Sequence, residues 1–294
     1  MITPVLLTWR ERRGTYRPVG EPLDTRLYEV AAIPDDKTAR VFVEANHYSG
    51  TYPAARFRFG LYFCGLLVGI AVFSVPMQAR VFDPLYPLDV LSGPLRDDGS
   101  FTSGGGGNLV VIPGDPRQHV ELGRLVLLDS VPSNAESWFV SRCFELLYHR
   151  EDVIAVVSFS DPFPRDNASG ERVFKGHIGT IYQSLNAVHA GRATARTLRL
   201  LPDGTVFSDR AIQKIRAQER GHEYAEEILE RLGAPRCDGD PATWLRTWLP
   251  RVTRTARHPG NIRYLFGLDR RVRKYLPASL PYPKFQPGIG LIEA

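Results

Sequence analysis

The sequence predicts an α/β (α+β) protein with a mixed, mostly antiparallel central sheet flanked by helices. Two apolar runs, 55–63 and 66–76, are separated by two residues, which is the pattern of a tight β-hairpin. Further along, an apolar strand at 120–129, a helix at 133–151 and an apolar strand at 153–162 follow one another as a βαβ-like unit. A hairpin pairs its strands antiparallel and a βαβ unit pairs them parallel, so both kinds of pairing are expected in one sheet.

The N-terminal half supplies the first helix and the hairpin. Residues 36–46 predict a short helix, because Asp36 can cap it and apolar residues recur at helical spacing. The hairpin turn falls on Cys64-Gly65, and Pro76 ends the second strand. Residues 76–119 are rich in Pro, Gly, Ser and Asp and predict a loop-rich insertion.

The C-terminal half begins with a short helix within 176–192, followed by strands over 194–207 that turn at Pro-Asp-Gly. Residues 208–234 read as helix in two parts, broken near Gly221. We therefore expect a catalytic-type domain over residues 1–207. A basic helical extension over 208–294 is expected to pack on it and contact nucleic acid.

Composition limits the class of protein. The 294 residues are 43% hydrophobic and 23% charged, as in ordinary globular proteins. Three widely spaced cysteines form no CxxC pair, which argues against a disulfide framework and favours a cytoplasmic location. The longest apolar run, 61–75, is too short to cross a bilayer, so no membrane partner is expected.

Basic residues concentrate toward the C-terminus. Residues 191–294 contain 19 Lys/Arg against 11 Asp/Glu, whereas residues 1–190 contain 18 against 21. This asymmetry indicates a polyanionic partner, although a solvated arginine-rich surface would look the same. The segment 251–277 interleaves its cations with aromatic residues, a pattern suited to phosphates and bases. The expected DNA-contacting residues there are Arg254, Arg257, Arg263, Arg270, Arg271, Arg273 and Lys274.

Several polar side chains occupy positions where chemistry is common. Asp161 follows the central apolar strand, where ligands bind in open α/β sheets, or else it starts a turn. His47 and Tyr48 follow the first helix, and His47 with Asp161 could hold iron or manganese. Arg124 lies in an apolar strand and needs an anionic partner: Glu121, Asp161 or a ligand phosphate. Ser137 is in a helical first turn, where backbone N–H groups can bind an anion.

The order of these segments resembles the phage Mom DNA-modification family, proteins of the GNAT acyltransferase-like superfamily. The matching segments run from about residue 30 to 285, and 76–119 is the least comparable part. They are "HYS" at 47–49, "ELGRLVL" at 121–127, "AESWFVSRCFELL" at 135–147, "VSFSDP" at 157–162, "GHIGTIYQSLNAVHAGR" at 176–192, "NIRYLFGLDRRVRKYL" and "LPYPK".

The resemblance implies an enzyme that adds a carbamoylmethyl (acetamido) group to the exocyclic N6 of adenine and so shields phage DNA from restriction. Double-stranded DNA is then the partner, and the cytoplasm of a phage-infected or prophage-bearing bacterium is the location. By position, the implied site residues are His47, Tyr48, Arg124, Ser137, Asp161 and Tyr182.

The implied donor departs from that of ordinary GNAT enzymes. Their glycine-rich pyrophosphate turn is replaced here by "LLDSVPSNAES". Acetyl-CoA or another activated two-carbon or glycyl donor is therefore expected, and a bound iron could assist. In such a reaction Asp161 would accept an N6 proton, Tyr48 or Tyr182 would act as an acid or stack on the base, and Arg124 with the helix start at Ser137 would stabilise negative charge on the donor.

Two other functions fit the sequence. One is a GNAT N-acetyltransferase acting on an amine of a small molecule or of an already modified base, and acetyl-CoA binding would favour it. The other is a non-catalytic DNA-binding protein, although binding alone does not need the set His47, Tyr48 and Asp161.

Overall fold

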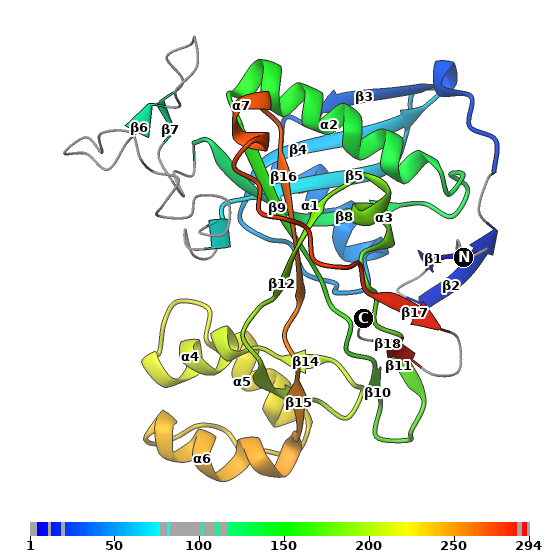
Figure 1. Ribbon diagram of the computed structural model, residues 1–294. Coiled ribbons are helices and arrows are strands. Elements are labelled where there is room, and N and C mark those ends of the chain that lie inside the picture. The colour runs from blue at the N-terminus through cyan, green and yellow to red at the C-terminus, as the bar shows by residue number, and fades with distance from the viewer. Residues whose placement is uncertain are drawn as a thin grey trace. The chain divides into compact units, whose positions relative to one another are not determined.

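A computed structural model (Figure 1) describes residues 5–10, 13–18, 21–76, 81–82, 101–102, 110–111, 117–286 and 290–292. The insertion predicted at 76–119 lies mostly outside this part of the chain. The chain forms two compact units. Unit 1 consists of residues 1–161, 177–192 and 262–294, and unit 2 of residues 162–176 and 193–261.

Unit 1 is built on a seven-stranded sheet with the strand order β12-β16-β9-β8-β5-β4-β3. Only β8 and β9 pair parallel within it, and every other neighbouring pair is antiparallel. The predicted mixed, mostly antiparallel sheet is therefore confirmed. Its strands are β3 (Tyr28–Ala32), β4 (Ala55–Phe63), β5 (Leu66–Ser74), β8 (His119–Leu127), β9 (Ala155–Ser160), β12 (Val188–Arg192) and β16 (Ile262–Gly267).

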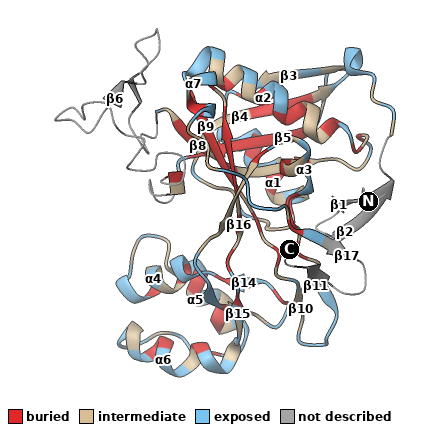
Figure 2. Ribbon diagram, in the orientation of Figure 1, coloured by how far each residue is buried: buried red, intermediate tan, exposed pale blue. Residues whose placement is uncertain are grey.

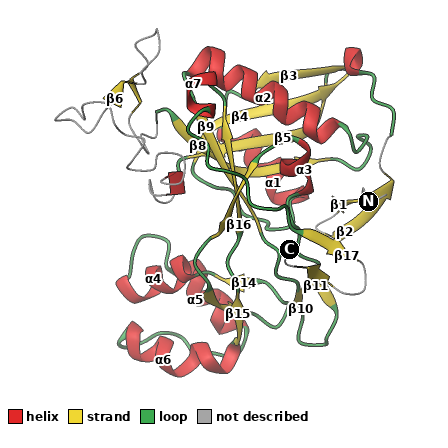
Figure 3. Ribbon diagram, in the orientation of Figure 1, coloured by secondary structure: helices red, strands yellow, loops and turns green. Residues whose placement is uncertain are grey.

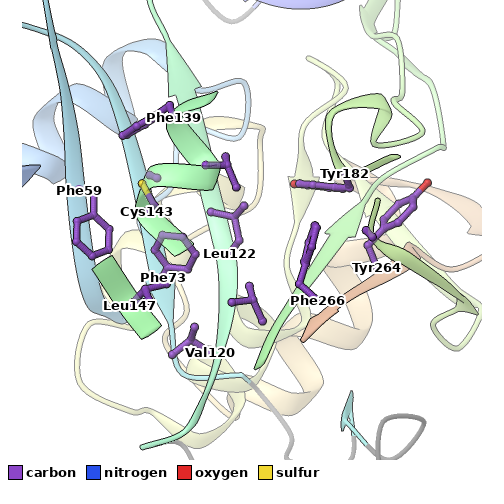
Figure 4. Packing of buried hydrophobic residues seen from close by; sticks show 14 of the residues in the cluster. Phe59, Phe73, Val120, Leu122, Phe139, Cys143, Leu147, Tyr182, Tyr264 and Phe266 are labelled. Atoms are coloured by element: carbon purple, nitrogen blue, oxygen red, sulfur yellow. The ribbon is translucent and has the colours of Figure 1, made fainter. Parts of the chain in front are cut away.

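Helices cover both faces of this sheet, because its central strands are apolar on both sides. On β5, Ile70 and Val72 pack with α1 (Asp36–Asn46), whereas Ala71 and Phe73 belong to the cluster beneath α2 (Ala135–Glu151). Figure 2 shows these strands as the most continuously buried part of the unit. Figure 4 shows Phe139, Cys143 and Leu147 of α2 next to buried side chains of the sheet.

The predicted hairpin, first helix and βαβ unit are all confirmed, with one change at a helix cap. Asp35, not Asp36, caps α1, and its carboxylate accepts a hydrogen bond from the Thr38 backbone N–H at 2.8 Å. The hairpin turn places Cys64 and Gly65 at positive φ, as a two-residue turn between twisted strands requires.

The sheet opens in its middle, between β8 and β9. The two strands pair from His119↔Ala155 to Leu122↔Ser158 and no further, although both continue. At the same level Gly123 is an extra residue in β8, because Val72 and Phe73 pair with Arg124 and Leu122. A Cβ at Gly123 would lie 2.9 Å from the Ser74 hydroxyl, so the bulge favours glycine. This opening creates the space for a site.

Unit 2 combines a small sheet with helices (Figure 3). The sheet has the order β14-β13-β15, and a hairpin of β10 and β11 accompanies it. The two-part helix predicted at 208–234 is confirmed, with Gly221 at positive φ in the break. The elements are β10 (Arg165–Asp166), β11 (Arg172–Phe174), β13 (Arg196–Leu200), β14 (Val206–Phe207), α4 (Asp209–Ala217), α5 (Glu223–Arg231), α6 (Pro241–Val252) and β15 (Arg254–His258).

The predicted domain boundary at residue 207 differs from this division, and the expected helical extension over 208–294 is wrong for its basic part. Residues 254–258 and 262–267 are strands, and the second of them, β16, lies inside the central sheet of unit 1. Ile262, Tyr264 and Leu265 are almost fully buried there, and this burial outweighs the local basic composition.

The other elements are short. They are β1 (Val5–Arg10), β2 (Arg13–Pro18), the 3₁₀ helix η1 (Thr25–Leu27), β6 (Phe101–Thr102), β7 (Val110–Val111), α3 (Thr180–Ser184), α7 (Arg270–Arg273), β17 (Lys284–Gln286) and β18 (Gly290–Ile292). None of the helices in the described ranges has the length and hydropathy needed to cross a bilayer.

Candidate functional site

A cavity of about 110 Å³ lies where β8 and β9 separate. Its wall comes from five parts of unit 1: the segment after α1, the middle of β8, the start of α2, the end of β9, and α3 with the loop that leads into it. Four residues implied by the resemblance line it together: His47, Tyr48, Arg124 and Tyr182. The other lining residues are Leu122, Gly123, Leu125, Glu136, Phe159, His177, Gly179, Thr180 and Ile181.

His47 is held as a neutral imidazole. Its backbone N–H closes α1 by donating to the Val43 carbonyl, and its Nδ1 accepts from the Ser49 backbone N–H at 3.1 Å. Burial lowers its pKa well below the usual value, and the charges of Arg124 and His177 lower it further. Because Nδ1 accepts, the proton of the neutral ring is on Nε2, which leaves His47 as a hydrogen-bond donor.

Tyr48 is placed between two histidine rings. Its ring centroid lies 4.2 Å from that of His47, and its hydroxyl lies 3.3 Å from Nε2 of His177. The His177 backbone N–H in turn donates to the Asp161 carbonyl at 2.8 Å. Tyr48 thus joins the segment after α1 to the loop that leads into α3.

Arg124 is anchored by backbone and hydroxyl groups instead of a carboxylate. Its Nε donates to the Thr51 carbonyl at 2.9 Å, its Nη2 donates to the Thr51 hydroxyl at 2.7 Å, and its Nη1 donates to the Gly123 carbonyl. The expected pairing through Glu121, Asp161 or a phosphate is not what fixes it. Burial lowers the pKa of Arg124, whereas Tyr48 and Glu121 raise it. A guanidinium held by neutral acceptors keeps its charge available to a ligand.

Tyr182 forms a wall of the cavity. Its side chain is buried, and burial raises its pKa to about 12. Its ring packs against Tyr264 at 5.3 Å and Phe266 at 6.3 Å between centroids, as Figure 4 shows. These contacts make Tyr182 a poor acid near neutral pH and suit it to packing against a ligand.

Ser137 and Asp161 do not line the cavity. The Ser137 hydroxyl donates to the Asn134 carbonyl at 3.3 Å, so its proton is engaged within the first turn of α2. Asp161 follows β9 as predicted and is half-buried. The helix start is engaged elsewhere too, since the Ser133 backbone N–H donates to the Glu21 carboxylate at 2.7 Å. That carboxylate lies where a ligand phosphate would compete for the same donor.

The hydrogen bonding of His47 does not suit it to bind iron together with Asp161. Within the described residues, no three His, Cys, Asp or Glu side chains are grouped as metal ligands. In addition, the Ser49 N–H fixes the proton of His47 on Nε2, the nitrogen that a metal would need.

Comparison with known families identifies the relatives of this chain. Residues 27–86 and 105–284 match the model of the Mom protein family. The chain belongs to the Mom protein family. This confirms the resemblance read from the sequence, and the match covers both β8 and β9 with the cavity between them. No curated protein matches the chain.

The basic residues predicted to contact DNA are divided between the two units. Arg254 and Arg257 lie on β15 of unit 2, and Arg263, Arg270, Arg273 and Lys274 lie in unit 1. Two of them are used structurally, since Arg254 donates to the Asp166 carbonyl and the Nε of Arg273 donates to the Gly267 carbonyl at 2.7 Å. The side chain of Arg271 lies outside the described residues. Arg257 is exposed on its strand.

Two titratable residues that line the cavity, His177 and Glu136, are not among the site residues predicted from the sequence. His177 lies between Gly176 and Gly179, both at positive φ, so the "GHIG" pattern was the available signal. Glu136 lines the cavity, whereas the sequence favoured its neighbour in the chain, Ser137. Adjacent residues on a helix face different directions, and only the packing of α2 shows which one faces the cavity.

Proposed function

We propose that the protein transfers a carbamoylmethyl group to the exocyclic N6 of adenine in double-stranded DNA, in the cytoplasm of a phage-infected or prophage-bearing bacterium. The observation that carries this proposal is the cavity at the β8–β9 opening, where His47, Tyr48 and Arg124 converge in a member of the Mom family. A site with one cation, one neutral imidazole donor and a phenol is suited to transferring a group to an amine.

The target base must leave the double helix to reach such a cavity. Adenine N6 is paired in a duplex, and extrusion costs a few kcal/mol. The aromatic wall formed by Tyr182 and the Tyr48 ring can pack against a flipped base. Basic residues that remain exposed, such as Arg257, would bind phosphates of the DNA backbone.

Two side chains are placed to stabilise the donor. As the donor reacts, negative charge develops on its carbonyl oxygen or leaving group. The Arg124 guanidinium and the Nε2–H of neutral His47 both line the cavity and can donate to that charge. Neither needs to reorganise, because Thr51 holds Arg124 and Ser49 holds His47.

The start of α2 favours a donor without a conventionally bound pyrophosphate. The Glu21 carboxylate occupies the Ser133 N–H, and the adjacent cavity is only about 30 Å³, little more than a water molecule needs. An activated two-carbon or glycyl donor therefore fits better than acetyl-CoA bound in the usual way. Calorimetry with acetyl-CoA is expected to show no binding. Tight binding would support the acetyltransferase alternative instead.

The proposal is tested by expressing the protein in a bacterial host and analysing nucleosides from the digested host DNA by mass spectrometry. A matched culture expresses Arg124→Gln at the same level. We expect a deoxyadenosine whose mass is increased by an acetamido substituent only with the wild-type protein. Modification of another base, or unchanged nucleosides with soluble folded protein, would contradict the proposal.

A further inference from the structure

We propose that Tyr48 and His177 form a proton relay, in which His177 accepts the proton that the target amine loses through Tyr48. This inference rests on the proposed function, because adenine N6 is the amine. It assigns a role to His177, which neither the sequence analysis nor the family match identifies.

The relay follows from the geometry around Tyr48. The Tyr48 hydroxyl and Nε2 of His177 are 3.3 Å apart, and their rings meet edge to face with centroids 5.9 Å apart. Both side chains line the same cavity, so a ligand there can reach the hydroxyl while the imidazole lies next to it. In this arrangement a phenol can pass a proton to the imidazole as it receives one from a substrate.

The backbone around His177 is fixed, which makes the contact a feature of the fold. The His177 N–H is bound to the Asp161 carbonyl, and the flanking glycines have φ values of +73° and +71°. A Cβ at Gly179 would lie 2.7 Å from the Tyr182 ring and 2.8 Å from the Tyr264 ring. The loop therefore has little freedom, and the imidazole is presented to Tyr48 by tightly packed neighbours.

The ionisable groups near Tyr48 and His177 act on the pair in different ways. Arg124 from β8 interacts electrostatically with Tyr48, and its positive charge favours a transient phenolate. His47 does not compete as a base, since its Nδ1 is bound by the Ser49 N–H. Tyr182 from α3 has its pKa raised to about 12. Glu136 from α2 lines the same cavity, and Glu121 acts through Arg124.

The proposed step conserves atoms and charge. A bond forms between adenine N6 and the methylene carbon of an activated two-carbon donor that already carries the terminal carboxamide, and the bond from that methylene carbon to its leaving group breaks. The leaving group takes the electron pair. One N6 proton moves to the Tyr48 oxygen while the Tyr48 proton moves to Nε2 of His177, which becomes an imidazolium and later releases the proton to water.

The test compares Tyr48→Phe, His177→Phe and the double variant with the wild type, in single-turnover modification of duplex DNA across pH. Each single variant is expected to slow the reaction by about 100-fold or more, the usual range for a lost acid–base group. The double variant is expected to be no slower than the slower single variant, because the two residues act as a unit. The wild-type rate is expected to fall toward acidic pH, and this fall is expected to disappear in His177→Phe. His149→Phe on the exposed side of α2 is the matched control.

A second measurement does not depend on activity. In NMR titrations of the full-length protein, the His177 ring is expected to titrate differently in Tyr48→Phe than in the wild type. Additive effects of the two variants, an unchanged pH profile in His177→Phe, or an unchanged His177 titration would overturn the relay. If the wild-type protein modifies no adenine, the proposed function fails, and the titration still decides whether the Tyr48 hydroxyl and the His177 ring interact in solution.

Discussion

The cavity of unit 1 and the small sheet of unit 2 use positive charge in opposite ways. Arg124 in the cavity is largely buried, and its guanidinium is held by three hydrogen bonds. On the sheet, strands β13 and β15 carry four arginines and no acidic residue. Within the described part of the chain, the guanidinium groups of Arg199 and Arg257 make no hydrogen bond or ion pair.

The strand register explains how the unit 2 arginines are displayed. Arg199 pairs with Thr255, and Arg257 pairs with Thr197, so these four residues share one face of the sheet. The intervening Leu198 and Leu200 are buried on the other face. This difference between the buried and the exposed arginines indicates two uses of positive charge. A fixed, desolvated cation suits a reacting group, whereas exposed cations suit a mobile and well-hydrated phosphate backbone. Variants in the two regions should therefore affect different measurable quantities.

The largest effect on activity is expected from Arg124→Gln. Removing a preorganised cation that meets charge in the transition state should slow modification by about 100-fold to 1,000-fold. DNA affinity, measured by fluorescence anisotropy, should stay within about twofold of the wild type. Arg199→Gln is the matched control on unit 2 and should leave the rate at saturating DNA unchanged. A similar rate for Arg124→Gln and the wild type would show that the cavity is not the reaction site.

The hydrophobic core beneath α2 in unit 1 and the helical core of unit 2 can be destabilised separately. Leu147→Ala in the core beneath α2 and Leu229→Ala in the helical core of unit 2 should each cost about 3 kcal/mol of unfolding free energy. Hydrogen exchange should show lost protection in the unit that carries the substitution and little change in the other. Equal loss of protection in both units after either substitution would mean that they unfold as one.

Lowering the pH should destabilise unit 1 through the protonation of His47. Its folded-state pKa lies below the unfolded value near 6.5, so the unfolded state binds more protons in this range. The free energy of unfolding has its full value above that pH. It falls as the pH is lowered below that value, by up to about 1.4 kcal/mol per pH unit. Denaturant midpoints measured from pH 8 to pH 5 should fall for the wild type. They should fall less for His47→Gln, and identical curves would contradict a buried neutral imidazole.

The smallest effects are expected on the unit 2 sheet. Arg199→Ala and Arg257→Ala should each reduce the slope of log affinity against log salt by about 1, the share of one phosphate contact. DNA binding across a salt series measures this slope. Arg210→Ala is the control, because Arg210 already pairs with Glu219. Unchanged slopes in both variants would place the DNA contact on another surface.

The sequence predicted the first helix, the hairpin and the βαβ unit because each depends on a local pattern. Apolar periodicity, turn residues and cap residues all act within a few positions of the chain. The sequence did not predict strand β16. Its segment "NIRYLFG" is surrounded by arginines, and the burial of that segment depends on the distant strands β9 and β12. The same limit applies to DNA contacts, since composition selected Arg254 and Arg273 but not the hydrogen bonds that engage them.

The site shows the same division between local and distant information. By itself the sequence predicted the family and the mixed sheet, and it selected four residues that line one cavity: His47, Tyr48, Arg124 and Tyr182. Only the tertiary structure decided that Glu136 replaces Ser137 in the cavity and that His177 reaches Tyr48, 129 residues away. The physical reason is that hydrogen bonds and burial at a site are made between segments whose separation in space is set by the packing of the whole sheet.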